Sequence, residues 1–312
     1  MWNYNMKYFN TEKKEYIDKF FNKSFSKCNI SFEIFPPSDC KIESKFWILI
    51  QTLIKFKPKF ISITYRNINN SYNNKTYNIV KKIQKYTNIE LAPHITCINL
   101  KNNELYNLAK KYWKNGIKHV IALRGDKTKF NNNINSLIYA SDLVYFLKKI
   151  ANFNITVAAY PEIHPESKNI KEDLVNLKRK IDAGATRAIT QFFFNIETYL
   201  TFRDKCISQG INIEIIPGIL PITNFIQLKK IIKITNIKIP DFINNMFQNL
   251  NGQDEKICKL LGSFIAIEMI RRLKNEGVNH FHFYTLNKLE IVYAICLYLG
   301  IKPNENILTN KT

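Results

Sequence analysis

The sequence predicts an α/β protein with a single domain, a (β/α)8 TIM barrel over residues 28–305. Three observations support this fold class. Eight short runs rich in β-branched and aromatic residues alternate with longer amphipathic segments. Several of the short runs, such as His119–Leu123, are almost continuously apolar, which is typical of parallel strands buried on both faces. Eight such repeats in a chain of 312 residues match the usual size of this barrel.

The expected strands are spaced so that a helix can follow each of them. They are Ser31–Phe35, Phe60–Tyr65, Glu90–Cys97, His119–Leu123, Ile155–Tyr160, Arg187–Phe193, Ile213–Ile216 and Phe281–Tyr284. Apolar residues recur at helical spacing between them, as at Leu105, Leu108 and Tyr112, and Gly116 then provides a natural helix end. Another helix is expected over Asp173–Asp182, and it also ends near a glycine, Gly184.

Three segments are expected to lie outside the regular barrel. Residues 1–27 are predicted to form a helical N-terminal extension, and residues 306–312 a flexible tail. The Asn-rich segment Lys127–Ser136 is expected to be a mobile loop over the barrel mouth.

The main alternative fold is a doubly wound sheet, which normally carries a Gly-rich turn after an early strand. No GxGxxG occurs among the nine glycines, so a phosphate-cradling loop of that type is excluded.

Composition points to a protein of the cytoplasm. The six cysteines are scattered and form no CxxC pair, which suits reduced thiols rather than disulfides or a zinc site. The N-terminus has no apolar core of a signal peptide. No uncharged apolar run approaches the roughly 18 residues that a membrane helix needs. We therefore expect a cytoplasmic localisation and no membrane partner.

The formal net charge of +21 has two interpretations. It can attract nucleic acid or an acidic ligand. It can also reflect compositional drift, because Lys, Asn, Ile, Tyr and Phe abound while Gly and Pro are scarce, as A+T-rich codons favour. The lysines are spread along the chain without a dense basic block. We favour drift and expect no specific nucleic-acid partner, although a positive field would still assist an anionic cofactor or substrate.

Polar side chains stand where nearly every expected strand ends, which is the face where TIM barrels hold their active sites. Glu33 is the clearest candidate, because it lies inside the apolar run from Ile30 to Phe35. A carboxylate there is costly to bury unless it is paired or protonated, and a raised pKa would suit a general acid. The alternative is a glutamate that pairs with a lysine or arginine of the barrel.

Other candidates have structural alternatives of similar weight. Asp126 follows Arg124 and Gly125, and this turn could hold a ligand ring or could simply begin the next helix. His280 and His282 could mimic a metal pair on one strand face, but we favour a hydrogen-bonded strand histidine beside a surface one. No histidine has a metal-ligand spacing, and no metal is expected. The run 178–180 is either a solvated basic face or a clamp for a diphosphate.

Nine ordered motifs resemble those of the bacterial methylenetetrahydrofolate reductases, across about residues 28–303. They are SFEIFPPSD (31–39), ISITYR (61–66), APHITC (92–97), ALRGD (122–126), YASDLV (139–144), AAYPEIHPES (158–167), DLVNLKRKIDAGATRAITQFFFN (173–195), EIIPGILPITNF (214–225) and HFYTLN (282–287). A single short motif would mean little, but nine in the family's order are highly specific. The resemblance implies a TIM barrel with non-covalently bound FAD.

The resemblance also implies roles for individual residues. Glu33 corresponds to the catalytic proton donor. The implied cofactor contacts are Thr64, Tyr65, His94, Arg124, Gly125, Asp126, Ala140, Tyr160, His164, Ser167, Asp173, Asn176, Arg179 and Lys180, with Thr64 and Gln191 near the nicotinamide. The implied folate contacts are Asp126, Gln191, Tyr284 and Lys288.

The implied reaction is ping-pong. NAD(P)H, with NADH favoured, reduces FAD and leaves. Methylenetetrahydrofolate then binds, Glu33 protonates its bridging nitrogen, and a hydride from the flavin completes the methyl group that methionine synthesis uses. The resemblance further implies a homo-oligomer, often a tetramer.

Four departures from the family pattern affect the expected site. Arg66 and Asn67 replace a glycine and a small residue, Ser167 replaces an alanine, and Ile231 stands where an aromatic ring commonly stacks on the ligand. Lys288 replaces an arginine, which keeps the charge but loses bidentate geometry. Two other functions remain open alternatives: a basic barrel that binds nucleic acid, and a metal-dependent TIM-barrel hydrolase, whose ligand cluster these histidines do not supply.

Overall fold

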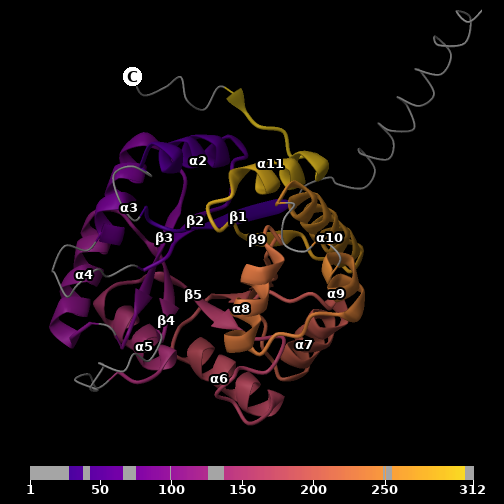
Figure 1. The fold of residues 1–312 in the computed structure, drawn as a ribbon. Coiled ribbons are helices and arrows are strands. Elements are labelled where there is room, and N and C mark those ends of the chain that lie inside the picture. The colour runs from indigo at the N-terminus through magenta and orange to yellow at the C-terminus, as the bar shows by residue number, and fades with distance from the viewer. Residues whose placement is uncertain are drawn as a thin grey trace, which may run out of the picture.

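The computed structural model describes residues 28–37, 43–65, 75–98, 100–125, 137–248, 250 and 255–305. The predicted N-terminal extension 1–27, the loop 127–136 and the tail 306–312 lie outside the described residues, as do Cys40, Arg66, Asn67 and Asp126. Strands and helices alternate along the rest, and the helices surround the strands (Figure 1). The predicted fold class is confirmed.

All strands run parallel in one sheet. They are β1 (Asn29–Ile34), β2 (Ile61–Ile63), β3 (Leu91–Thr96), β4 (His119–Leu123), β5 (Asn154–Ala159), β6 (Arg187–Thr190), β7 (Glu214–Ile216), β8 (Gly218–Ile219) and β9 (His280–Tyr284). The strand order is β7-β6-β5-β4-β3-β2-β1-β9-β8. Each of the eight predicted strands is present, and four of them (β2, β3, β6 and β7) are shorter than expected.

The barrel closes at a proline. β7 and β8 are the two ends of the strand order, and only Pro217 separates them along the chain. β7 pairs with β6 and β8 pairs with β9, while the Pro217 carbonyl accepts a 3.0 Å hydrogen bond from the backbone N–H of His282. Because proline has no N–H to donate, the ladder is interrupted there. The seventh barrel strand therefore appears in two parts, whereas the sequence predicted only Ile213–Ile216.

Helices connect the strands on the outside of the barrel. In the described part of the chain they are α2 (Glu43–Lys55), α3 (Lys75–Tyr86), α4 (Asn102–Lys114), α5 (Ala140–Ile150), α6 (Ile170–Asp182), α7 (Ile196–Ser208), α8 (Phe225–Thr235), α9 (Asp241–Gln248), α10 (Glu255–Asn275) and α11 (Leu289–Tyr298). α4 shows why such segments are helical: Leu105, Leu108 and Tyr112 bury one face, and Gly116 follows with φ +79°.

Strand alternation divides the apolar core into two layers. Residues such as Phe32 and Ile34 point outward and pack under the helices. A smaller cluster fills the barrel interior, and its buried members are Phe60, Ala92, Ile121, Ile189 and Ile216. The barrel is thus a packed core and not a pore.

The prediction for the strand histidines was wrong in one respect. His280 and His282 do lie on one face of β9, but neither is at the surface: their exposed fractions are 7% and 0%. Both rings face the barrel interior, beside Phe60. A spacing of two residues on a strand places both side chains on the same side, so a buried partner implies that the other is buried too.

Candidate active site

The C-terminal ends of β2–β5 and one side of α6 enclose a cavity of about 810 Å³. Its volume lies within the range of roughly 300–1,000 Å³ that is usual for ligand sites. The predicted cofactor contacts in the described residues all line it: Thr64, Tyr65, His94, Arg124, Gly125, Ala140, Tyr160, His164, Ser167, Asp173, Asn176, Arg179 and Lys180. The fold thus brings together side chains from segments more than one hundred residues apart.

His94 lines this cavity and lies beside Glu33, which is not one of the lining residues. Nε2 of His94, on β3, lies 3.5 Å from Oε2 of Glu33 on β1. Both side chains are almost fully buried. Burial raises the pKa of Glu33 to about 8 and lowers the pKa of His94 to about 3. The pair is therefore neutral at pH 7, with the proton on the carboxyl group.

No lysine or arginine in the described ranges forms an ion pair with Glu33, so the alternative of a structural salt bridge is not observed. The strand register instead places Glu33 beside Ser62 of β2 and Tyr284 of β9. Neither neighbour brings a compensating charge. A carboxyl group in such a setting is stable only when it is protonated.

Helix α6 supplies the polar wall of the cavity. Asn169 caps the helix by accepting a 3.1 Å hydrogen bond from the backbone N–H of Glu172. Asp173 is buried and accepts hydrogen bonds from the backbone N–H of His164, at 2.8 Å, and from the Ser167 hydroxyl. These bonds fold the segment between β5 and α6 back against the helix, so that it forms one side of the cavity.

Two cations project from later turns of α6. Lys180 donates a 2.8 Å hydrogen bond to the carbonyl of Ala158, and burial lowers its pKa to about 8. Arg179 donates to the side-chain carbonyl of Asn176 at 3.2 Å. Lys178 points elsewhere, is half exposed and lies 4.0 Å from Asp182. Only Arg179 and Lys180 of the run 178–180 line the cavity, so the run is not simply a solvated basic face.

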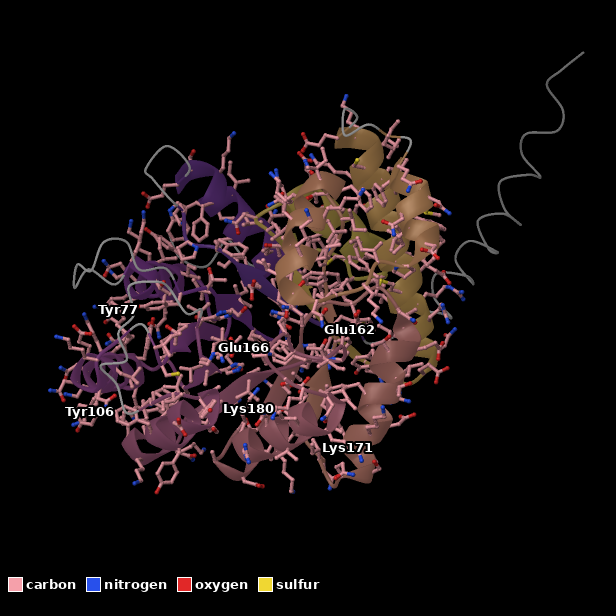
Figure 2. All side chains as sticks on the ribbon, turned by 60° about the horizontal axis from the view of Figure 1, so that its bottom comes forward. Tyr77, Tyr106, Glu162, Glu166, Lys171 and Lys180 are labelled. Atoms are coloured by element: carbon pink, nitrogen blue, oxygen red, sulfur yellow. The ribbon has the colours of Figure 1, made fainter. Side chains whose placement is uncertain are left out.

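An ion pair crosses the cavity between two loops. Arg124, after β4, donates two 2.7 Å hydrogen bonds to the carboxylate of Glu166, after β5. Glu166 and Lys180 lie near the centre of the view in Figure 2, whereas Lys171 of the same helix lies at the edge of the molecule. Tyr160 and His164 pack edge to face, with ring centroids 4.5 Å apart. The two hydrogen bonds to Glu166 hold the Arg124 guanidinium in a fixed orientation at the cavity.

The sequence did not single out all the residues that line the cavity. Tyr139, Ser141, Asp142, Glu166 and Glu172 do so as well. Glu166 was part of the quoted motif AAYPEIHPES, and its position two residues after His164 was the available signal. Tyr139, Ser141 and Asp142 likewise belong to the quoted motif YASDLV, whereas Glu172 lies outside the quoted motifs.

The predicted folate contacts in the described residues do not line the cavity: Gln191 directly follows β6, Tyr284 is the last residue of β9, and Lys288 precedes α11. The Tyr284 hydroxyl donates to the carbonyl of Thr190 at 2.7 Å, and the Gln191 side chain accepts from the backbone N–H of Phe192 at 3.0 Å. Lys288 is exposed after β9. Gly218 permits this packing, because a Cβ there would lie 2.3 Å from the Thr190 carbonyl and 2.5 Å from the Tyr284 ring. Ile231 is half-buried on α8.

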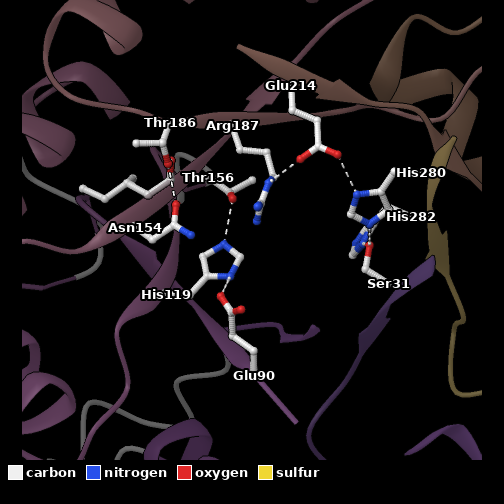
Figure 3. A network of polar contacts seen from close by, with 11 residues as sticks. Ser31, Glu90, His119, Asn154, Thr156, Thr186, Arg187, Glu214, His280 and His282 are labelled. Carbon is white, nitrogen blue, oxygen red and sulfur yellow. Dashed lines mark hydrogen bonds and ion pairs between the residues drawn. The ribbon is translucent and has the colours of Figure 1, made fainter. Parts of the chain in front are cut away.

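A second polar cluster lies in the barrel interior at the N-terminal ends of the strands (Figure 3). Glu214 joins Arg187 at 2.8 Å to His280 at 2.9 Å, and His280 contacts Ser31 at 3.2 Å. On the other side, His119 bonds to Glu90 and to Thr156, each at 2.7 Å. His119 and His280 also contact the ring of Phe60, a member of the apolar interior cluster.

Two kinds of feature are absent from the described ranges. No group of three or more His, Cys, Asp or Glu side chains there could hold a metal ion. No helix there is long and apolar enough to cross a membrane.

Comparisons with known proteins agree with this geometry. The family model for Methylenetetrahydrofolate reductase matches residues 19–300. A 5,10-methylenetetrahydrofolate reductase of Salmonella typhimurium is 48% identical over 298 residues, 96% of this chain and 99% of that one. One from Buchnera aphidicola (Acyrthosiphon pisum) is 53% identical over 273 residues, covering 87% and 91% of the two chains.

A solved structure has the same fold. It is an uncharacterised Clostridium thermocellum protein that binds two copies of 5-methyl-5,6,7,8-tetrahydrofolic acid. It superposes with a TM-score of 0.58 at 18% identity, over 91% of this chain and 98% of that one. At this identity the likeness concerns the fold alone.

Proposed function

The chain belongs to the methylenetetrahydrofolate reductase family, and we propose that it reduces 5,10-methylenetetrahydrofolate to 5-methyltetrahydrofolate with FAD held in the cavity of β2–β5 and α6 and NADH as hydride donor. The observation that carries the proposal is the buried carboxyl of Glu33 beside His94, a residue that lines the cavity. With its pKa raised to about 8, Glu33 holds a proton at pH 7 and can give it to a substrate nitrogen.

The cavity fits the chemistry of FAD. A dinucleotide carries a diphosphate, and Arg124, Arg179 and Lys180 offer cationic donors for it. Asp173 and Asn176 offer oxygen acceptors for ribose hydroxyls on the same wall. Lys180 is the most telling of these residues, because a largely buried ammonium with one carbonyl partner gains from an anion beside it.

The opposite wall suits a flat ring. Gly125 and Ala140 are small, so they permit a close approach, and Tyr65 and His94 line the same cavity. The flavin would supply the hydride chemistry, and the protein supplies position and electrostatics. Gly125 has φ +88°, a conformation that glycine adopts without a steric penalty.

The residues of the chain then act on the folate. Glu33 donates its proton to the bridging nitrogen of methylenetetrahydrofolate, which opens the five-membered ring. The His94 ring is uncharged, and its Nε2 stays beside the Glu33 carboxylate that forms. Gln191, Tyr284, Asp126 and Lys288 would contact the folate. Ile231 offers no aromatic ring for stacking, so we expect the pterin to be held more by hydrogen bonds than by stacking.

The absorbance spectrum of the purified protein tests this function. We expect a flavin spectrum that anaerobic NADH bleaches and that methylenetetrahydrofolate restores, which is the signature of a ping-pong reaction. A colourless protein that does not bind added FAD would contradict the cofactor assignment. A flavin that NADH reduces but that methylenetetrahydrofolate does not reoxidise would contradict the folate reaction.

Three further features belong to the same proposal. NADH is expected to reduce the flavin faster than NADPH, which parallel stopped-flow traces measure. The product would supply methyl groups for methionine synthesis. A homo-oligomer, with a tetramer favoured, is expected and can be measured by light scattering. A steep salt dependence of DNA or RNA binding without bound flavin would instead favour a nucleic-acid function.

A further inference from the structure

The proposed reaction requires Glu33 to regain a proton after every turnover. After each turnover the carboxyl group has lost its proton, and its exposed fraction is only 9%. The cavity side is the side on which the flavin and the folate would lie. A route for the returning proton that avoids the bound ligands would have to pass through the barrel interior.

A line of polar side chains occupies that interior, here called the axial chain. Its members in order from the N-terminal face of the barrel are Glu214, His280, Ser31 and His282 (Figure 3). Glu214 is 45% exposed, so it meets solvent. The successive contacts are 2.9 Å, 3.2 Å and 2.8 Å, all within hydrogen-bond range. Hydrogen bonds therefore connect solvent to His282, which is fully buried.

The upper end of the axial chain lies beside Glu33. On the ladder between β1 and β9, Ser31 pairs with His282, and Glu33 follows two residues later on the same inward face. Two residues along a strand are roughly 7 Å. His282 also lies within electrostatic range of His94, as well as of His280 and His119. The strand register thus makes His282 and Glu33 near neighbours inside the barrel, and a relay between them needs a bridging group.

Unsatisfied polar atoms lie on or beside these two residues. Among the described residues, Nε2 of His282, Nε2 of His94 and Oγ of Ser62 are fully shielded and have no hydrogen-bond partner. Ser62 pairs with Glu33 in the strand register, and His94 approaches Glu33 to 3.5 Å. A buried polar position with two to four such partners is the usual setting of an internal water.

We propose that the axial chain, extended by one internal water, is a proton relay that returns a proton to Glu33 from the N-terminal face of the barrel. The inference rests on the proposed role of Glu33 as proton donor. It gives the interior histidine a part in the reaction, at the end of the barrel opposite the ligands.

The relay conserves protons and moves no electrons. Nε2–H of His282 breaks as the bridging water takes that proton and gives one of its own to the Glu33 carboxylate. Ser31 gives its hydroxyl proton to Nδ1 of His282 and takes one from Nε2 of His280. The hydrogen bond from His280 and the nearby Arg187 lower the pKa of Glu214, so its carboxylate first takes a proton from solvent and then passes it to Nδ1 of His280. Because burial disfavours a charged ring at His282, the transfers occur as a concerted exchange of tautomers.

The decisive comparison is between one turnover and many. In the Ser31→Ala variant, Glu33 starts protonated, so NADH-reduced enzyme should reoxidise with methylenetetrahydrofolate at the wild-type rate in a single turnover. Steady-state kcat should fall about tenfold or more, because the second proton arrives slowly. Ser31→Thr keeps a hydroxyl and should restore kcat. The control is Thr156→Val, which removes a buried hydroxyl that bonds to His119 outside the axial chain.

Two results would overturn the relay. An equal loss in single-turnover and steady-state rates would show that Ser31 only supports the structure. An unchanged kcat would show that protons reach Glu33 through the cavity. A wild-type protein that binds no flavin or reduces no folate would instead reject the proposed function, before any variant is compared.

A second pair of variants avoids changes in the core. Glu214→Gln alters the solvent end of the axial chain, and Glu90→Gln alters a similarly exposed carboxylate that bonds to His119. We expect a selective fall in kcat for the first and wild-type values for the second. Equal behaviour of the two variants would contradict the relay.

Nitrogen NMR of the histidine rings gives a readout without ligand or turnover. The relay requires His282 in its ligand-free resting state to carry its proton on Nε2 and to accept from Ser31 at Nδ1. The ¹⁵N shifts of labelled histidines report this tautomer directly. A proton on Nδ1 of His282 in the wild-type protein would contradict the direction of transfer.

Discussion

Nε2 of His94 lies 3.5 Å from the carboxyl of Glu33, and neither group has a charged partner within hydrogen-bond distance in the described part of the chain. Burial moves the two pKa values in opposite directions, so the pair is neutral at pH 7. An ion pair would place two charges in the same buried space. This relationship makes Glu33 available as an acid, and the first predictions follow from it.

Glu33→Gln should abolish folate reduction and leave flavin binding and NADH oxidation intact. The amide keeps the shape of the side chain but cannot give up a proton, and a general acid commonly contributes about 10²–10⁴ in rate. Stopped-flow absorbance separates the two half-reactions. Glu162→Gln is the matched control, because this glutamate accepts a hydrogen bond from the backbone N–H of Lys238 and does not line the cavity. Near-wild-type folate reduction in Glu33→Gln would remove the proton-donor role.

The pH dependence of stability should reveal the buried carboxyl independently of any activity. The folded pKa of Glu33 is about 8, above the unfolded value near 4.5, so only the folded state holds the proton between these limits. Stability is therefore lost as the pH rises from 4.5 to 8. The free energy of unfolding of Glu33→Gln, relative to that of wild type, should therefore rise by roughly 2–5 kcal/mol between pH 4.5 and pH 8. Above pH 8 this difference should stay constant. Urea unfolding of both proteins at several pH values measures this difference. A difference between variant and wild type that did not change from pH 4.5 to pH 8 would contradict the raised pKa.

Lys180→Gln should weaken FAD binding by about ten- to a hundredfold, the usual effect of losing a charged hydrogen bond. Because the pKa of Lys180 is lowered to about 8, wild-type affinity should decline as the pH rises through 8, and the variant should show no such decline. Flavin fluorescence titration of the apoprotein measures both effects. Lys178→Gln, half exposed on the same helix, is the control. Equal losses in the two variants would mean that only the general positive field matters.

Gly218→Ala should destabilise the barrel by about 1–3 kcal/mol, because the new Cβ overlaps the Thr190 carbonyl and the Tyr284 ring. We expect the Tyr284 hydrogen bond to be lost and folate affinity to fall with it. Gly210→Ala separates steric overlap from backbone strain, since nothing lies within 4 Å of its added Cβ but φ is +70°. That control should cost about 1 kcal/mol and leave folate affinity unchanged. Thermal unfolding and a folate titration test both expectations.

Hydrophobic periodicity was sufficient to predict the fold, because each barrel strand has an apolar outer face under a helix. Pro217 shows the limit of that signal. A proline followed by a glycine is typical of a turn, and only the pairing with β9 shows that the strand continues to Ile219. The predicted Phe60–Tyr65 likewise shortens to Ile61–Ile63, because strand ends depend on partners that the local sequence does not contain.

The candidate site was predictable where a motif fixed the positions, as for His94, His164 and Lys180, all of which line the cavity. The sequence did not show which of these side chains would bond to one another. Nothing local indicated that Glu166 would hold Arg124, since the two residues meet only when β4 and β5 lie side by side. The functional roles of these residues stay predictions, and Asp126 lies outside the described residues.

The pairing of β1 with β9 joins two ends of the barrel that are about as far apart in the chain as the fold permits. During synthesis, β1 emerges early, and Tyr284 is among the last barrel residues to appear. Until then Glu33 has an open edge beside it, where water lets a carboxyl group ionise at neutral pH. A nascent chain that already possesses every wall of the cavity would thus still lack a working acid. Under the proposed mechanism, Glu33 would become an acid only when the last strand docks.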